Sequence, residues 1–216
     1  MALGFPTGGD GGDIIPIIKF DARAGRMFRR DRINGENEQI DITQDFKAIF
    51  DFENVETGTI NFNTGSAPDF AVARYGDRIP PKPSDDHKPG VRLLVKLGKD
   101  SGGDVRELAS TARVFLTGID NLHNAYLDGV KANHGKLPIV SLTSCLPITT
   151  GEGARKSTNY SPVFNVVGWA DRPADLTYIP RAKAGDGAAQ GAAPSAPPAT
   201  GSTRVSAPSA SSDDFG

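Results

Sequence analysis

A single helical pattern, set between segments with the patterns of strands, restricts the fold that this chain can adopt. Apolar residues recur every three or four positions from residue 105 to residue 130, as on one face of a helix: Val105, Leu108, Ala112, Phe115, Ile119, Leu122, Tyr126 and Val130. Asp104 and Glu107 have the spacing of a capping box, which predicts that the helix starts at Asp104. No second helix follows at βαβ spacing, which disfavours a parallel doubly wound sheet.

The segments around this helix predict a mainly β fold. Short apolar or alternating runs predict strands at residues 14–20, 46–52, 59–63, 91–97, 137–142 and 162–169. The polar residues 54–58 predict a hairpin turn between the second and third of these runs, and the Pro-rich residues 64–90 predict a long loop. Strands with one helix inserted among them predict an OB-fold-like β-barrel, and an elaborated β-sandwich is the alternative.

Composition divides the 216 residues into three parts. Residues 1–12 are rich in Gly and predict a flexible N-terminus, whereas residues 13–180 carry the strand and helix patterns and predict the OB-like domain. Residues 181–216 consist mainly of Ala, Gly, Ser and Pro, and Phe215 is their single aromatic residue. Such a segment buries too little apolar surface to offset the entropy lost on ordering, which predicts a disordered tail.

Several classes of protein are disfavoured. No run approaches the roughly 20 apolar residues of a membrane span, and the first residues lack the pattern of a signal peptide. A single cysteine, Cys145, suits a reducing compartment, so we expect a cytoplasmic protein without a membrane partner. Asp85, Asp86 and His87 lack a second His at metal-ligand spacing, and no nucleophile or phosphate-loop motif is present. We therefore expect no catalytic residue, metal or cofactor.

One segment is strongly basic although the chain has a net charge of −2. Between residues 19 and 32, Phe20 and Phe28 are interleaved with six cations: Lys19, Arg23, Arg26, Arg29, Arg30 and Arg32. Single strands are bound by cations at their phosphates and by aromatic rings that stack on their bases. The segment therefore predicts nucleic-acid contacts with Phe28 as the stacking ring, and Arg74 and Tyr75 are further candidates. The alternative is a solvated hairpin whose phenylalanines enter the core.

The last residues, Asp213-Asp214-Phe215-Gly216, combine two carboxylates with an aromatic ring. The ring can enter an apolar pocket of a partner while the carboxylates contact a basic rim. A folded domain, a Gly/Pro/Ala/Ser linker and an acidic-aromatic end together resemble the single-stranded DNA-binding proteins of bacteria and phages. The resemblance covers the architecture and the tip. It implies that Asp213, Asp214 and Phe215 recruit replication or recombination proteins and compete with DNA for the domain.

The basic segment and this resemblance together predict a phage-encoded protein that coats single-stranded DNA during replication or recombination, in the cytoplasm of a bacterial host. Residues 13–180 would then be its OB-like nucleic-acid-binding domain, and a homo-oligomer is compatible with the sequence. Two alternatives from other classes stay open. One is a phage structural or assembly protein with a flexible tail, and the other is a small nucleic-acid-processing enzyme that uses Asp85, Asp86 and His87.

Overall fold

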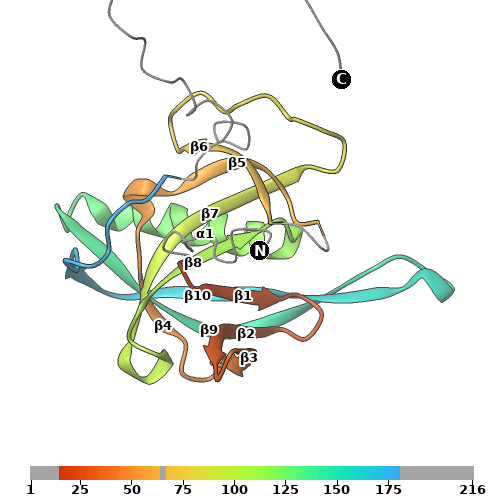
Figure 1. Ribbon diagram of the computed structural model, residues 1–216, viewed down its shortest axis with the longest axis horizontal. Helices are drawn as coiled ribbons and strands as arrows, with labels where there is room; N and C mark the ends of the chain where they lie inside the picture. The colour runs from red at the N-terminus through yellow and green to blue at the C-terminus, as the bar shows by residue number, and fades with distance from the viewer. Residues whose placement is uncertain (1–14, 64–66, 181–216) are drawn as a thin grey trace, which may run out of the picture. The chain divides into compact units, whose positions relative to one another are not determined.

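The computed structural model describes residues 15–63 and 67–180 (Figure 1). The predicted flexible N-terminus, residues 1–12, and the predicted tail, residues 181–216, lie outside these ranges. Within them, ten strands form one sheet, and one α-helix is inserted between β8 and β9. The sheet curls into a partial barrel, so the predicted mainly β, OB-like fold is confirmed (Figure 1).

The strands of this sheet vary from short segments to long hairpin arms. In chain order they are β1 (Ile17–Asp21), β2 (Arg26–Ile33), β3 (Glu36–Asp41), β4 (Lys47–Phe50), β5 (Glu56–Asn61), β6 (Asp69–Arg74), β7 (Lys88–Leu97), β8 (Val105–Ser110), β9 (Lys136–Thr150) and β10 (Ser157–Asp171). Their order in the sheet is β10-β9-β4-β7-β8-β1-β2-β3, with β5 paired to β7 and β6 paired to β5. β1 and β8 are parallel, whereas the other pairs are antiparallel.

The central strand β7 shows how the two faces of the sheet differ. Val91, Leu93 and Val95 alternate along it and enter the main hydrophobic core, which we call the inner side. Leu94 faces the opposite, outer side and packs in a second, smaller apolar cluster with Leu137 and Leu176. Leu176 belongs to the segment after β10, so that segment covers part of the outer side.

The helix α1 (Arg113–Val130) packs on β10. Its buried residues include Phe115, Ile119, Leu122 and Tyr126, four members of the predicted apolar stripe. Burial of such large side chains contributes about 1.5–3 kcal/mol each. Two glycines let the helix approach the strand closely, because a Cβ at Gly118 would lie 2.7 Å from the Pro162 carbonyl oxygen and one at Gly129 would lie 2.4 Å from the Trp169 ring. No helix in the described ranges has the length and apolar character needed to cross a membrane.

The predicted start of this helix at Asp104 is wrong. Residues 105–110 form β8 instead, paired to β7 and β1, and the helix begins at Arg113. Ion pairs explain the difference: Arg106 contacts Asp104 and Asp31, and Glu107 contacts Arg92 of β7. The three-residue spacing of Val105 and Leu108 fits a helix. Arg106 and Leu108, however, are two residues apart and lie on the same face, as they do in a strand.

The predicted hairpin between residues 46–52 and 59–63 is also wrong. β4 and β5 do not pair; they follow one another along the same edge of β7, with the pairs Phe50–Val95 and Glu56–Arg92. A short 3-10 turn between them, η1 (Phe52–Asn54), interrupts one long pairing without reversing the chain, and residues 56–58 of the predicted turn belong to β5. The edge of β7 therefore determines the direction of both strands.

Two further predictions need correction. Residues 64–90 are not one long loop, because β6 and the start of β7 lie within them. The predicted strands 137–142 and 162–169 are the inner halves of a longer hairpin, β9–β10, whose outer part projects beyond the body of the sheet (Figure 1). The remaining short turns are η2 (Lys99–Ser101) and η3 (Gly153–Arg155).

Candidate nucleic-acid interface

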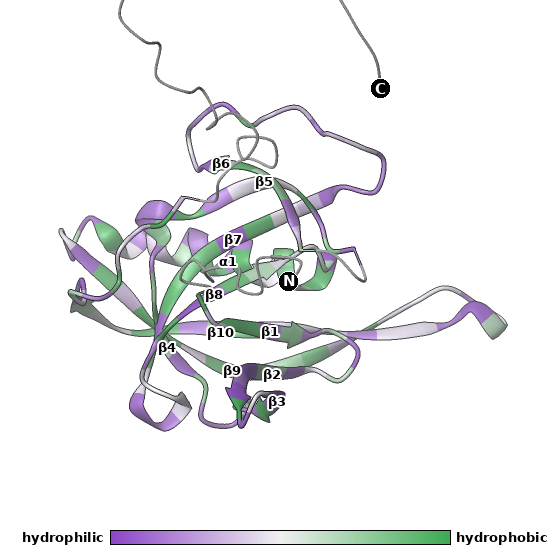
Figure 2. Cartoon of the chain, viewed as in Figure 1, coloured by the Kyte–Doolittle hydropathy of each residue, from purple (hydrophilic) through white to green (hydrophobic). Residues whose placement is uncertain are grey.

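Strand β2 carries the predicted basic segment and divides it between its two faces. Met27 is fully buried, so the residues that alternate with it point to the outer side: Arg26, Phe28, Arg30 and Arg32. Lys19 of β1 is the register partner of Phe28 and joins them. We call this set, Lys19, Arg26, Phe28, Arg30 and Arg32, the basic face. Hydrophilic residues dominate β2 and β3, whereas apolar residues dominate β1 (Figure 2).

A tight turn between β2 and β3 holds this arrangement. Asn34 and Gly35 both have positive φ, 53° and 87°, as a two-residue hairpin turn requires. The resulting register places Gln39 opposite Arg30 and Asn37 opposite Arg32. The basic face therefore continues on β3 as two amides, which can donate to and accept from the edges of a base.

The basic face keeps a positive charge, because its four cations share it with two carboxylates, Asp21 and Asp41. Arg26 binds Asp41 at 2.7 Å, whereas Lys19, Arg30 and Arg32 form no ion pair within the described part of the chain. The two carboxylates accept hydrogen bonds from their own loops, and these hydrogen bonds keep them ionised. A hydrogen bond from Thr43 is the main cause that lowers the pKa of Asp41, and the backbone N–H of Ala24 is the main cause that lowers that of Asp21.

The structure brings together five of the predicted contact residues and places the others elsewhere. Arg29 alternates with Phe28 and lies on the inner side, where its Nη1 donates to the Ser101 carbonyl at 3.2 Å and its Nε contacts Asp31. Asp31 also binds Arg106 at 2.6 Å, so this acid is turned away from the basic face. Arg23 is exposed in the turn between β1 and β2.

Arg74 and Tyr75 lie at the end of β6, on a different part of the domain. The Arg74 guanidinium lies over the Tyr178 ring and is 3.6 Å from Asp77. The Tyr75 ring contacts His123 of α1 and lines an apolar groove of about 640 Å³ between the helix and β5. Neither residue adds to the basic face. A shared role in binding would therefore require a nucleic acid to cross between separate surfaces of the domain.

The acidic segment before β7 is held by its own contacts. His87 is buried, with Nδ1 2.8 Å from the Ser84 hydroxyl and Nε2 3.2 Å from Asp69. Asp85 and Asp86 are exposed, and the Asp85 carboxylate lies 3.5 Å from the Lys82 ammonium. Within residues 15–63 and 67–180, no three metal-ligating side chains come together.

Sequence reasoning missed Asn37 and Gln39. Their signal was present: they alternate with glutamates after an Asn-Gly turn, which is typical of the return strand of a hairpin. The tip residues Asp213, Asp214 and Phe215 lie outside the described ranges.

No protein family model matches the chain, and no curated protein and no solved structure shows a significant similarity to it.

The basic face combines side chains of the kinds that can contact a nucleic acid without reading its sequence. One half-exposed aromatic ring lies among four cations, with two amides beside them. A stacked base contributes about 1–3 kcal/mol regardless of its identity. Arginine also forms paired hydrogen bonds to phosphate oxygens that lysine cannot form.

Proposed function

We propose that this chain is a non-enzymatic single-stranded DNA-binding protein, phage-encoded, that coats exposed strands during replication or recombination in the cytoplasm of a bacterial host. The observation that carries the proposal is the basic face, where Phe28 lies between Lys19, Arg26, Arg30 and Arg32 on an exposed hairpin of an OB-like barrel. Bases would stack on Phe28 while the arginines contact the flanking phosphates.

The net charge of −2 does not argue against this role. Charges farther away than about 8–10 Å are largely screened at physiological salt, so the local cations determine the attraction of a phosphate. Asp213, Asp214 and Phe215 would recruit replication or recombination proteins and would compete with DNA for the basic face.

Fluorescence anisotropy with a labelled oligothymidine tests this proposal. The full chain and a variant that lacks residues 207–216 are titrated at low salt, since the predicted tail would compete with the strand. We expect both to bind, the truncated chain more tightly. The double variant Arg30→Gln/Arg32→Gln should weaken binding, whereas Lys131→Gln/Lys136→Gln, an equal charge change on exposed lysines away from the basic face, should not. Absence of binding by both the full chain and the chain that lacks residues 207–216 would refute the proposal.

A second candidate, a structural or assembly protein, is favoured by the projecting β9–β10 hairpin. Leu146 is 56% exposed there and Ile148 is 40% exposed. An exposed apolar pair on a long hairpin suits a contact between copies of the chain. Light scattering of the wild type and of Leu146→Asp/Ile148→Asp would detect it. Large assemblies of the wild type that are absent in the variant, together with no DNA binding by the wild type, would favour this second role.

A further inference from the structure

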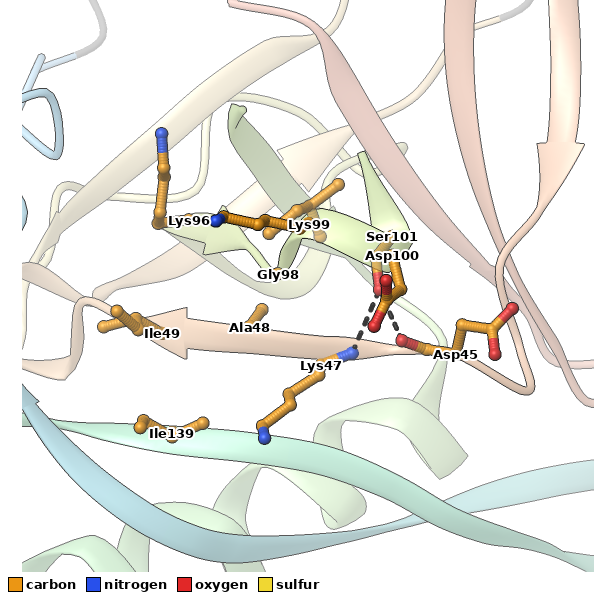
Figure 3. A pocket seen from close by; sticks show the side chains of 11 residues that line it. Asp45, Lys47, Ala48, Ile49, Lys96, Gly98, Lys99, Asp100, Ser101 and Ile139 are labelled. Atoms are coloured by element: carbon orange, nitrogen blue, oxygen red, sulfur yellow. Dashed lines mark hydrogen bonds between the residues drawn. The ribbon is translucent and has the colours of Figure 1, made fainter. Parts of the chain in front are cut away.

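A cleft of about 310 Å³ lies on the outer side of the sheet, where β4 runs between β7 and β9. Its apolar floor includes Ile49 and Ile139, which are register partners on adjacent strands. Three lysines surround the floor: Lys47 from β4, Lys96 from β7 and Lys99 from the turn η2 (Figure 3). An apolar floor below several ammonium groups is suited to a flat ring that carries an anionic group.

The wall of the cleft is fixed by hydrogen bonds to the turn η2. The buried Ser101 hydroxyl donates to the Asp45 carbonyl and accepts from the backbone N–H of Lys47 (Figure 3). The backbone N–H of Gly98 also donates to the Lys47 carbonyl at 2.7 Å. The cleft is therefore already formed, and binding a ligand would not have to order its wall.

The lysines differ in how far they are committed to other contacts. Lys96 binds Asp175 of the segment after β10, whereas Lys47 and Lys99 form no ion pair within the described residues. Asp45 and Asp100 also line the cleft. The Asp45 carboxylate points away from the lysines in Figure 3. Because they are not held in an ion pair as Lys96 is, Lys47 and Lys99 are the cations best placed for an anion.

The turn η2 reaches both the cleft and the inner side of β2. This turn supplies Lys99 to the cleft, and its Ser101 carbonyl accepts the Arg29 guanidinium of β2. The contact is close, since a Cβ at Gly102 would lie 2.2 Å from Arg29 Nη1. The cleft and strand β2, whose outer side carries the basic face, therefore share the turn η2 as a neighbour.

We propose that the cleft binds one nucleotide of the same DNA strand that crosses the basic face. The base would lie over Ile49 and Ile139, and the flanking phosphates would contact Lys47 and Lys99. This inference rests on the proposed function and adds a second subsite to it. A subsite beyond the basic face contributes only when the oligonucleotide is long enough to reach it, so the cleft should distinguish long strands from short ones.

The test compares Lys47→Gln/Lys99→Gln with the wild type on two oligothymidines of about 5 and about 20 nucleotides, lengths that bracket much of the range of about 4–16 nucleotides per OB domain. Lys131→Gln/Lys136→Gln is the matched charge control, and Arg30→Gln/Arg32→Gln reports on the basic face. Thermal melts establish that each variant is folded. Lys96 is left unchanged, because its pair with Asp175 holds the segment after β10.

We expect the cleft variant to bind the longer oligonucleotide roughly five- to ten-fold more weakly and to lower the slope of log affinity against log salt by about 1.4, the value for two phosphate contacts on a single strand. Its affinity for the shorter oligonucleotide should equal that of the charge control. Loss of binding in the basic-face variant but not in the cleft variant would overturn the cleft and leave the proposed function standing.

Three other results would also overturn the inference. Equal losses on both lengths would remove the cleft as a separate subsite. If the wild type binds inorganic pyrophosphate and the cleft variant does not, while both bind the two oligonucleotides equally well, the cleft is an anion site unrelated to the DNA strand. A wild-type chain that binds neither oligonucleotide, with or without residues 207–216, would overturn the proposed function together with the cleft.

Discussion

The Tyr160 ring of β10 lies directly against Gly25, in the turn between β1 and β2. A Cβ at Gly25 would lie 2.9 Å from Tyr160 Cγ, and the backbone N–H of Tyr160 donates to the Ala22 carbonyl at 2.6 Å. β10 and β1 are far apart in the strand order, so this contact brings two distant strands of the curled sheet together. It also supports the turn from which the basic face begins.

Gly25→Ala should destabilise the domain more than Gly35→Ala. Both glycines have positive φ, 66° and 87°, so both substitutions incur the cost of about 1–2 kcal/mol for a left-handed alanine. Nothing lies within 4 Å of a Cβ at Gly35, whereas the one at Gly25 would displace Tyr160. Urea unfolding measures both free energies. Equal losses would show that the Tyr160 contact does not depend on a bare backbone at Gly25.

The buried guanidinium of Arg92 should be among the most sensitive positions in the chain. It binds Glu56, and its Nε binds Glu107 at 2.7 Å, with all three side chains almost fully buried. Burial by itself lowers the pKa of Arg92, but the hydrogen bonds to Glu56 and Glu107 outweigh it, so the guanidinium remains charged. Its Nη2 also donates to the Ile179 carbonyl at 2.9 Å and ties down the segment after β10.

Arg92→Leu should lower the free energy of unfolding by about 3–5 kcal/mol, because it leaves two buried carboxylates without the guanidinium. Arg26→Leu removes an exposed pair with Asp41 and should cost only about 0–1 kcal/mol. Denaturant unfolding of both variants checks the difference. A loss below about 1 kcal/mol for Arg92→Leu would mean that the guanidinium is not what stabilises the buried Glu56 and Glu107 side chains.

Local periodicity predicted only the parts of the fold that depend on one segment. The stripe from Phe115 to Tyr126 is helical as expected, because its burial repeats every three or four residues. The start of the helix was mispredicted because the spacing of Val105 and Leu108 fits two structures, and the pairing of Glu107 with Arg92 decides between them. That partner lies in another strand, so no local pattern contains it.

The candidate site shows the same limit. The alternation of Arg26, Phe28, Arg30 and Arg32 was sufficient to place them on one face once β2 is known to be a strand, and it would also have excluded Arg29. The lysines of the cleft come from β4, β7 and η2, so only the order of the strands brings them together. Sequence reasoning could therefore find the basic face but not the cleft.

Substitutions at the basic face should separate stacking from charge. Phe28→Leu should weaken binding of single strands by about 1–3 kcal/mol without altering the salt dependence, because it removes a ring and no charge. Arg30→Gln should lower the slope of log affinity against log salt by about 0.7, the value for one phosphate contact. Phe62→Leu is the control, since Phe62 is 44% exposed and lies off the basic face. A Phe28 variant that binds like this control would remove the stacking role.

His123 should make the stability of the domain depend on pH in the weakly acidic range. Its ring lies among the rings of Phe52, Tyr75 and Tyr126, with centroid distances of 4.9–5.8 Å. Burial there lowers the pKa of His123 below its ordinary value of 6.5, and the nearby Asp120 offsets only part of this effect. The folded chain therefore holds the neutral ring more firmly than the unfolded chain does.

The unfolded chain consequently binds a proton at His123 first as the pH falls. The stabilisation is fully present above pH 6.5 and is lost as the pH falls through the lowered pKa of the folded state. Unfolding free energies measured between pH 7.5 and 5 should decline, and His123→Phe, which keeps an apolar ring among its neighbours, should flatten that decline. An NMR titration of the imidazole should give a pKa below 6.5. A value above 6.5, or an unchanged decline in the variant, would show that the ring is hydrated or paired with Asp120.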